Sequence, residues 1–414
     1  MAHISEEQIA QWDLIDPLAE KREAFTLPAN TVYLDGNSLG AMPTAAALRG
    51  KQVLEHQWAN DLITSWNTHS WIDLPATVGE KIAPLIGAAP EQVICCDSTS
   101  INLFKVLASA MTLQKNRSQV LSLAGNFPTD LYMVEGLTAL LGESHCHLKT
   151  VDEDTLEEAL TSEVAVLMVT QVDFRTGRLL DMQRVTHLAH KQGILVIWDL
   201  AHSAGALPIA LDECDVDFAV GCGYKYFNGG PGAPAFVYVA KRLQAHVSQP
   251  LKGWMGHKQP FAFAQGYEQA DNITQYLCGT PNVVSMSVLD AALEVFADVN
   301  MQQIREKSEA LSELFIALVE AEVALSDLVL VSPRATKDRG SQLAFEHEHA
   351  HGICQALIEL GVIADFRAPN ILRFGFTPLY LRYQDILTSV QILTQVIQQK
   401  VYLQAQYNKQ NKVT

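Results

Sequence analysis

The middle of the chain contains a series of short, mainly apolar runs, and this feature limits the possible folds most. The runs lie at 120–123, 164–169, 194–198, 218–220 and 235–240. Continuous apolar runs of this length are typical of strands buried on both faces, as in a parallel sheet covered by helices. Between the second and third runs, Met182, Val185 and Ala189 recur at helical spacing before Gly193. Strand, helix and strand in succession predict an α/β fold.

The pattern changes after about residue 283, and 414 residues are enough for two domains. Beyond that point come a long helical segment at 300–323, several short strand-like segments and a final helix near 383–405. We expect residues 46–283 to form a large domain with a mainly parallel sheet covered by helices. Residues 284–414 read as a smaller α+β domain, and residues 1–45 as an N-terminal arm and loop.

Charge and composition exclude several classes of partner. A net charge of −17 opposes binding to nucleic acid or to an anionic membrane surface. No apolar stretch approaches the ~20 residues of a membrane helix. The start "MAHISEEQIAQWD" is too polar for a signal peptide, and the seven cysteines form no CxxC pair. We expect a cytoplasmic enzyme that acts on a small molecule, without a nucleic-acid or membrane partner.

Chemically versatile side chains follow two of the predicted strands. Asp199 comes directly after the run at 194–198, and His202 lies three residues further on. Lys225 follows the next strand, within the glycine- and aromatic-rich stretch "GCGYKYFNGGPG". Ligands of open α/β sheets bind at the carboxyl ends of the strands, so an anion and an amine would meet there. A helix N-cap aspartate or an ordinary buried ion pair would produce the same pattern.

One cofactor uses these two groups separately. Pyridoxal phosphate needs a lysine for its Schiff base and an aspartate that keeps its pyridine nitrogen protonated. The stretch "DSTSINLFKVLASAM" opens an apolar helix with Ser98, Thr99 and Ser100, whose hydroxyls and amides suit a phosphate. Hydroxyl-rich helix starts are also common without a ligand.

Other motifs favour less specific interpretations. The stretch "EHEHAH" (346–351) lacks the HExxH spacing of a metalloprotease, and we expect no metal site there. The stretch "GGPGAPAF" lacks the Lys-Ser/Thr ending of a nucleotide phosphate loop. The pair Cys95-Cys96 is typical of strand core.

Several longer motifs together resemble the kynureninase family, which are pyridoxal-phosphate hydrolases of the aspartate-aminotransferase fold type. The resemblance covers essentially the whole chain. Its most specific segments are "YLDGNSLG" (33–40), "TSINLFK" (99–105), "NFPTD" (126–130), "WDLAHSAG" (198–205), "GCGYKYFNGGPG" (221–232) and "RFGFTPLY" (373–380).

The resemblance implies a role for each matching residue. Lys225 would be the Schiff-base lysine, Asp199 the partner of the pyridine nitrogen, and His202 a neighbour of the ring. Tyr224 would reach the phosphate and donate a proton, and Arg373 would hold the substrate α-carboxylate with its planar fork. The other implied cofactor contacts are Thr99 and Ser100 at the phosphate, Phe127 on the pyridine face, Asp130 and Thr170 in the same pocket, and Trp254 and Thr280 near a dimer interface. Gly221 and Gly223 would let the backbone approach the cofactor closely.

The implied reaction is hydrolysis of L-kynurenine to anthranilate and L-alanine by a homodimer, within tryptophan catabolism and NAD biosynthesis. We expect 3-hydroxykynurenine to react less efficiently, because Gly279 and Thr280 stand where animal members resemble Ser-Asn. A cysteine desulfurase or aminotransferase of the same fold is the alternative, although Cys354 lies in a helix that reads as buried. A non-catalytic binding protein would have no use for Lys225.

Overall fold

The computed structural model describes residues 4–409, and the chain divides into two compact units. The large unit comprises residues 46–173 and 180–293. The small unit comprises the described residues among 1–45, 174–179 and 294–414. The segment expected as an arm and loop therefore groups with the small unit, and the large unit extends past the expected border at residue 283.

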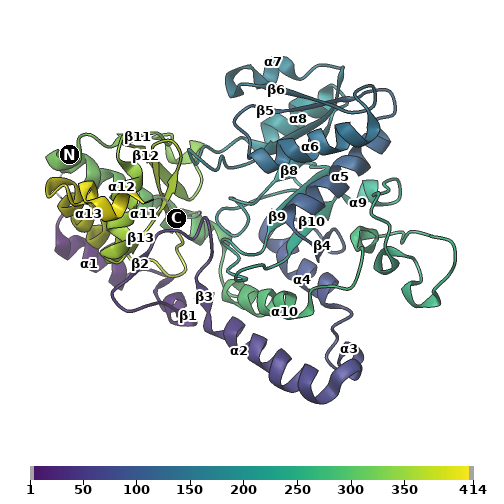
Figure 1. Ribbon diagram of the computed structural model, residues 1–414, viewed down its shortest axis with the longest axis horizontal. Helices are drawn as coiled ribbons and strands as arrows, with labels where there is room; N and C mark the ends of the chain where they lie inside the picture. Colours follow the sequence, from purple (N-terminus) through teal and green to yellow (C-terminus); the bar gives the residue numbers. More distant parts are fainter. Residues whose placement is uncertain (1–3, 410–414) are drawn as a thin grey trace. The chain divides into compact units, whose positions relative to one another are not determined.

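A seven-stranded sheet forms the centre of the large unit (Figure 1), in the order β4-β10-β9-β8-β7-β5-β6. Neighbours from β9 to β6 are parallel, whereas β10 is antiparallel to both β9 and β4. The mainly parallel sheet predicted from the apolar runs is confirmed. The strands are β4 (Val93–Cys96), β5 (Gln119–Leu123), β6 (His147–Val151), β7 (Val164–Thr170), β8 (Leu195–Asp199), β9 (Phe218–Cys222) and β10 (Ala235–Val239).

Helices cover this sheet and supply much of its core. Helix α5 (Thr99–Leu113) packs against β7 to β10, and its Leu103, Val106 and Leu107 are fully buried in the main apolar cluster. The remaining helices of the unit include α2 (Thr44–Gln52), α3 (Ser65–Thr68), α4 (Leu74–Ile82), α6 (Pro128–Leu141), α7 (Leu156–Ala159), α8 (Met182–Lys191), α9 (Lys241–Gln244) and α10 (Val283–Ala292). Among the described residues, no helix combines the length and the apolar composition needed to cross a bilayer.

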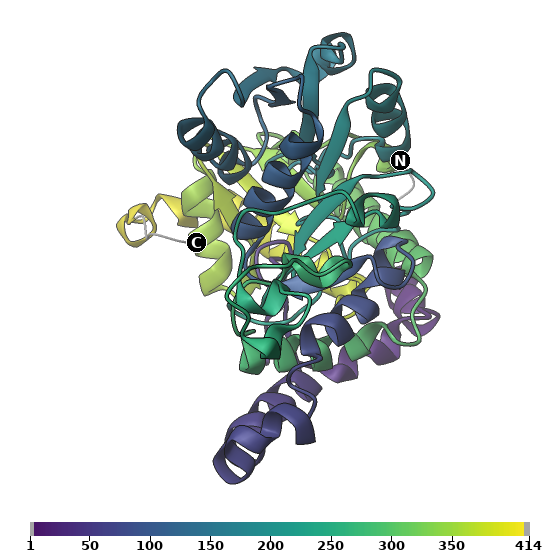
Figure 2. The ribbon, with the colours of Figure 1, turned by 90° about the vertical axis from the view of Figure 1, so that its right-hand side faces the viewer.

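One helical stretch projects from the large unit, as Figures 1 and 2 show. Helix α2 continues into a wider, π-helical segment, Val53–Asp61. Trp58 on this segment is 59% exposed.

The small unit is built around a four-stranded antiparallel sheet in the order β11-β12-β15-β14. Its core includes Phe315, whose ring lies 4.6 Å from that of Phe374 between centroids. The smaller α+β domain predicted for the C-terminal part is thus present. The elements of the unit are α1 (Glu6–Leu14), β1 (Phe25–Thr26), β2 (Val32–Tyr33), β3 (Met42–Pro43), α11 (Met301–Ala321), β11 (Val329–Leu330), β12 (Gln342–Glu346), α12 (Ala350–Glu359), β13 (Val362–Ile363), β14 (Asp365–Arg367), β15 (Ile371–Gly375) and α13 (Tyr383–Gln398).

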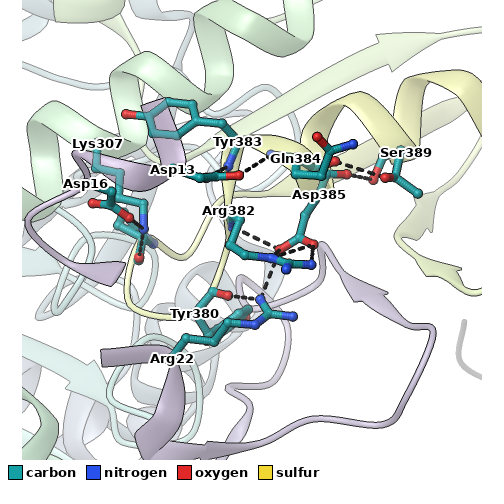
Figure 3. A network of polar contacts seen from close by, with 12 residues as sticks. Asp13, Asp16, Arg22, Lys307, Tyr380, Arg382, Tyr383, Gln384, Asp385 and Ser389 are labelled. Atoms are coloured by element: carbon teal, nitrogen blue, oxygen red, sulfur yellow. Dashed lines mark hydrogen bonds and ion pairs between the residues drawn. The ribbon is translucent and has the colours of Figure 1, made fainter. Parts of the chain in front are cut away.

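A polar network ties the N-terminal segment to α11 and α13 (Figure 3). The carboxylate of Asp13 accepts hydrogen bonds from the backbone N–H of Tyr383 (2.7 Å) and Gln384 (3.0 Å), at the start of α13. Lys307 pairs with Asp16 at 2.6 Å, and both side chains are at most 5% exposed. Buried charges are stable only when paired, so this contact holds α1 and the turn after it in place.

Candidate active site

Two strands of the large sheet end in register at the centre of the site. Thr170 ends β7, Asp199 ends β8, and the two residues are paired neighbours. Asp199 is only 3% exposed, and its Oδ1 accepts a hydrogen bond from the backbone N–H of Ala201 at 2.8 Å. A carboxyl group this deeply buried is stabilised in its charged form by a further donor or a positive charge beside it.

Asn126 connects Asp130 to the end of β7. Its amide Nδ2 donates to Asp130 Oδ2 at 2.8 Å, and its Oδ1 accepts from the backbone N–H of Thr170 at 2.9 Å. The hydroxyl of Thr170 donates to the same Asp130 oxygen at 3.3 Å. The sequence prediction included Asp130 and Thr170 but missed Asn126, although it begins the motif "NFPTD". An asparagine next to a helix start is a common capping residue, so its pattern alone does not indicate a site.

His202 and Lys225, which follow the neighbouring strands β8 and β9, lie close together. Lys225 Nζ lies 2.9 Å from His202 Nε2, within hydrogen-bond distance. The same ammonium group lies 5.8 Å from the centre of the Tyr224 ring. Burial is the main cause that raises the pKa of the Tyr224 hydroxyl, followed by the nearby charges of Cys222 and Asp199. Tyr224 consequently stays protonated at neutral pH and can serve as a proton donor.

The electrostatics of this cluster favour a cationic ligand atom. Burial raises the pKa of Asp199, while the N–H of Ala201 and the charge of Lys225 lower it. Burial, and next the charge of Asp199, raise the pKa of Asp130 well above its usual value. Lys225 acts on both carboxyl groups. A second positive charge beside Asp199 would keep both groups ionised, as a protonated pyridine nitrogen does.

The start of α5 supplies groups that fit a phosphate. Ser98 is the N-cap residue, and its hydroxyl accepts from the N–H of Ile101. Thr99 and Ser100 occupy the first turn, where backbone amides lack acceptors within the helix. The hydroxyl of Thr99 is buried and has no hydrogen-bond partner among the described residues. Free amides, an unpaired hydroxyl and the positive end of the helix dipole together suit an anion.

Gly221 and Gly223 also lie close to other parts of the protein. A Cβ atom at Gly221 would lie 2.5 Å from the ring of Phe236. At Gly223 it would lie 2.5 Å from the carbonyl oxygen of Pro234 and 2.7 Å from Leu289. These glycines allow close packing of the protein against itself, so their presence needs no cofactor.

Three of the expected cofactor residues lie at the surface. Phe127 precedes α6 and is 42% exposed, and Thr280 is exposed. Trp254 is 39% exposed and its ring stacks on Phe263 at 6.3 Å between centroids. Neither Trp254 nor Thr280 takes part in the hydrogen bonds described above at the ends of β7, β8 and β9.

Arg373 lies on β15 of the small unit and is 1% exposed. Its Nε donates to Asp365 Oδ1 at 2.7 Å, and its Nη2 binds Asp365 Oδ2. The planar fork that we expected to face a substrate carboxylate therefore faces Asp365. Sequence reasoning missed Asp365, because a lone aspartate on a short strand carries no motif.

The cysteines provide no exposed nucleophile of the desulfurase kind. Cys354 is fully buried in α12, and burial raises the pKa of its thiol. Cys95 and Cys96 are buried in β4, as predicted. Over the described part of the chain, no group of three His, Cys, Asp or Glu side chains could hold a metal ion.

Comparison with solved structures shows a shared fold. A cysteine desulfurase from Thermococcus onnurineus NA1 matches with a TM-score of 0.77 at 16% identity, over 96% of this chain and 100% of that one. A C-DES variant with glycine covalently linked to its PLP cofactor matches with a TM-score of 0.77 at 17% identity, over 90% and 98% of the two chains. At these identities the likeness concerns the fold alone.

Comparison of sequences is more specific. A model of the kynureninase C-terminal domain matches residues 304–393. A kynureninase from Burkholderia mallei is 48% identical over 413 residues, which cover 99% of each chain. A kynureninase from Pseudomonas fluorescens is 46% identical over 407 residues, which cover 97% of this chain and 98% of that one. With this identity over nearly the full length, the chain belongs to the kynureninase family.

Proposed function

We propose that the protein hydrolyses L-kynurenine to anthranilate and L-alanine, with pyridoxal phosphate attached at Lys225. The relatives named kynureninase support the reaction. The observation that carries the proposal is the contact between Lys225 and His202 beside the buried carboxyl group of Asp199. Such a reaction belongs to tryptophan catabolism and to NAD biosynthesis.

The residues present fit the cofactor at three points. Thr99 and Ser100 would hold its phosphate at the start of α5, where the hydroxyl of Thr99 has no other partner. Asp199 would face the ring nitrogen with its buried carboxylate. Lys225 would attach to it through Nζ. When bound, pyridoxal phosphate withdraws electrons from the α-carbon of an amino acid.

The chain itself supplies proton transfer. Lys225 Nζ would be the base that moves the α-proton, and His202 Nε2, which lies 2.9 Å from it, would orient it. Tyr224 keeps its hydroxyl proton at neutral pH because its pKa is raised. It can therefore donate a proton on the substrate side of the site. Phe127 and the network of Asn126, Asp130 and Thr170 would lie around the ring.

Arg373 would bind the α-carboxylate of the substrate. We also propose that L-kynurenine is preferred over 3-hydroxykynurenine. Gly279 carries no side chain that could bind a ring hydroxyl, and the preference should be modest, ~1–3 kcal/mol. Specificity constants for the two substrates test this, and a clear preference for the hydroxylated one would contradict it.

Two further proposals concern the oligomeric state and the cellular location of the enzyme. We infer a homodimer, because Trp254 and Thr280 match cofactor positions near the subunit interface and both are exposed in a single chain. We infer a cytoplasmic location from the acidic composition and from the seven free cysteines.

Trapping the cofactor tests the main proposal. Purified protein should be yellow, and borohydride should fix the cofactor on the peptide that contains Lys225. L-Kynurenine should change the visible spectrum and yield anthranilate, which is fluorescent. Lys225→Ala should abolish turnover, whereas Lys252→Ala, at an exposed lysine of the same unit, should not. A colourless protein, or a label on Lys105 or Lys252, would refute the assignment.

A further inference from the structure

Lys105, in the middle of α5, is a completely buried lysine of the large unit. Its ammonium group donates to Asp97 Oδ2, to the backbone carbonyl of Tyr276 at 2.6 Å and to Cys96 Sγ at 3.8 Å. An ammonium group has three N–H donors, and these contacts use all of them. Lys105 therefore has no donor left with which to bind a ligand directly.

The side chain of Lys105 keeps its charge in spite of its burial. Burial acts to lower the pKa of Lys105, but the neighbouring Cys96 and Asp97 outweigh this effect and raise the pKa above its usual value. A buried cation without an anionic partner would be strongly unfavourable. Asp97 is that partner, and its own side chain is 34% exposed. The ion pair thus has one end in the core and one end that water or a ligand can reach.

Asp97 forms the turn between β4 and α5. Its backbone φ is +48°, in the left-handed region that residues other than glycine rarely adopt. The carbonyl of Asp97 accepts from the backbone N–H of Ala235 at 2.9 Å, and the carbonyl of Cys96 accepts from Asn102 Nδ2 at 2.7 Å. A backbone in this conformation persists only where its surroundings hold it. The contact with Lys105 is the one that holds the Asp97 side chain.

The same turn leads directly into the start of α5, where the phosphate would bind. Ser98 is the N-cap residue, and Thr99 follows it with a buried hydroxyl that has no hydrogen-bond partner in the described part of the chain. Thr99 is two residues from Asp97, so their backbones are at most about 7 Å apart. At this distance a carboxylate without a counter-ion would repel a phosphate group, because both are negative. Lys105 removes this repulsion by neutralising Asp97.

We propose that Lys105 is a positioning residue for the phosphate of pyridoxal phosphate. It acts through Asp97: the ammonium group holds the turn before α5 and cancels a negative charge beside the phosphate. The proposal rests on the proposed function, from which it takes the place of the cofactor. Affinity for the phosphate then depends on a side chain that does not itself contact the cofactor.

Replacement of Lys105 by methionine tests this role, because methionine keeps much of the apolar stem and removes the charge. The dissociation constants of pyridoxal phosphate and of pyridoxal, which lacks the phosphate, are measured by absorbance titration of the cofactor-free full chain. We expect Lys105→Met to bind pyridoxal phosphate about 10- to 100-fold more weakly, and pyridoxal within about twofold of wild type. The matched control is Lys241→Met, which removes a lysine of the same unit that pairs with Glu91 at 2.7 Å. It should change neither constant.

Changes at Asp97 separate the effect of charge from that of packing. Asparagine tolerates a positive φ and keeps an oxygen that accepts from Lys105. Asp97→Asn should bind pyridoxal phosphate about 2- to 10-fold more tightly than wild type, because the charge of Lys105 is then uncompensated beside the phosphate. The double variant Lys105→Met/Asp97→Asn has neither charge and should regain most of the affinity that Lys105→Met loses.

An ion pair that only supports folding would give a different pattern. Lys105→Met would then weaken both ligands equally or neither, Asp97→Asn would bind pyridoxal phosphate no more tightly than wild type, and the double variant would recover nothing. Any of these results overturns the proposal, and Asp97→Asn decides it if Lys105→Met does not fold. Failure of the proposed function would appear instead in the wild-type protein, as absence of L-kynurenine hydrolysis or of cofactor at Lys225.

Discussion

Asp199 illustrates how position on the fold determines the chemistry of one residue. The carboxyl group ends an apolar strand, has almost no contact with water and receives a single backbone hydrogen bond. Its negative charge is therefore poorly stabilised by the protein alone. A cationic ring nitrogen would supply the missing partner, and the same contact would keep that nitrogen protonated.

Asp199→Asn should retain cofactor and lose turnover. A neutral amide keeps the shape and one hydrogen bond but cannot hold a proton on the ring nitrogen. We expect kcat to fall roughly 100-fold or more, as when a charge partner of the transition state is removed. Steady-state kinetics and the visible spectrum check this together. Near-normal kcat with bound cofactor would remove Asp199 from its role.

Asp35 allows a test of pH dependence in the small unit. Its pKa is raised to about 7 in the fold, above its usual value of 3.8, chiefly by burial. A raised carboxyl pKa means that the folded state binds more protons between these two values, so stability is lost as pH rises through that range. Asparagine does not ionise in this range. The Asp35→Asn variant should therefore keep its free energy of unfolding as the pH rises.

The expected gain for Asp35→Asn over wild type is roughly 1–4 kcal/mol at pH 8 and falls towards zero near pH 4. Thermal unfolding of both proteins across this pH range measures it. A difference in Tm that does not change with pH would show that Asp35 does not titrate in this way.

The residues of the large unit's site show what sequence could and could not predict. Lys225, His202 and Asp199 were predictable because strand ends gather at one edge of a parallel sheet. Asn126 was not, because it acts through Thr170, which is distant in the sequence. In the small unit, Asp365 was not predictable either, because a lone aspartate on a short strand carries no motif.

At the scale of elements, the contact between α4 and β4 depends on one glycine. A Cβ at Gly79 would collide with the backbone of Val93, which cannot move without disturbing the sheet. The positions of the strands were predictable because strands that are buried on both faces have continuous apolar sequences. The reversed direction of β10 was not, since an apolar run has the same composition in either direction.

Gly79→Ala should therefore destabilise the protein although alanine favours helices. We expect a loss of about 1–3 kcal/mol from overpacking, which exceeds the roughly 1 kcal/mol gained in helix propensity. Gly136→Ala in α6 is the matched control, because no atom lies within 4 Å of its new Cβ. That variant should gain stability. Urea unfolding measures the free energy of unfolding of both variants. Equal changes in the two would contradict the prediction.

For the whole molecule, the exposed positions of Trp254 and Thr280 bear on assembly. If both residues contact the cofactor, as proposed, their exposure in a single chain means that a second copy would complete the site. The relevant variants are Lys225→Ala, expected to be inactive, and an inactive variant at Thr280 or Trp254.

Mixing the two inactive variants should restore activity if sites are shared. Random exchange in a symmetric dimer would regenerate up to about a quarter of the wild-type sites. Activity is followed after subunit exchange has been shown with differently tagged chains. Exchange without any recovery would show that each chain completes its own site.

The division of the chain into units also has a consequence for its synthesis. Residues 46–173 and 180–293 form the large unit, so nearly all of it leaves the ribosome in one uninterrupted stage. The small unit combines early residues, such as Asp13 and Asp16, with partners on α11 and α13. Asp16 therefore stays unpaired until Lys307 has been translated, and Asp13 until Tyr383, which lies 370 residues further along the chain. The solubility of the N-terminal helix during this interval depends on its own polar sequence, "SEEQIAQWD".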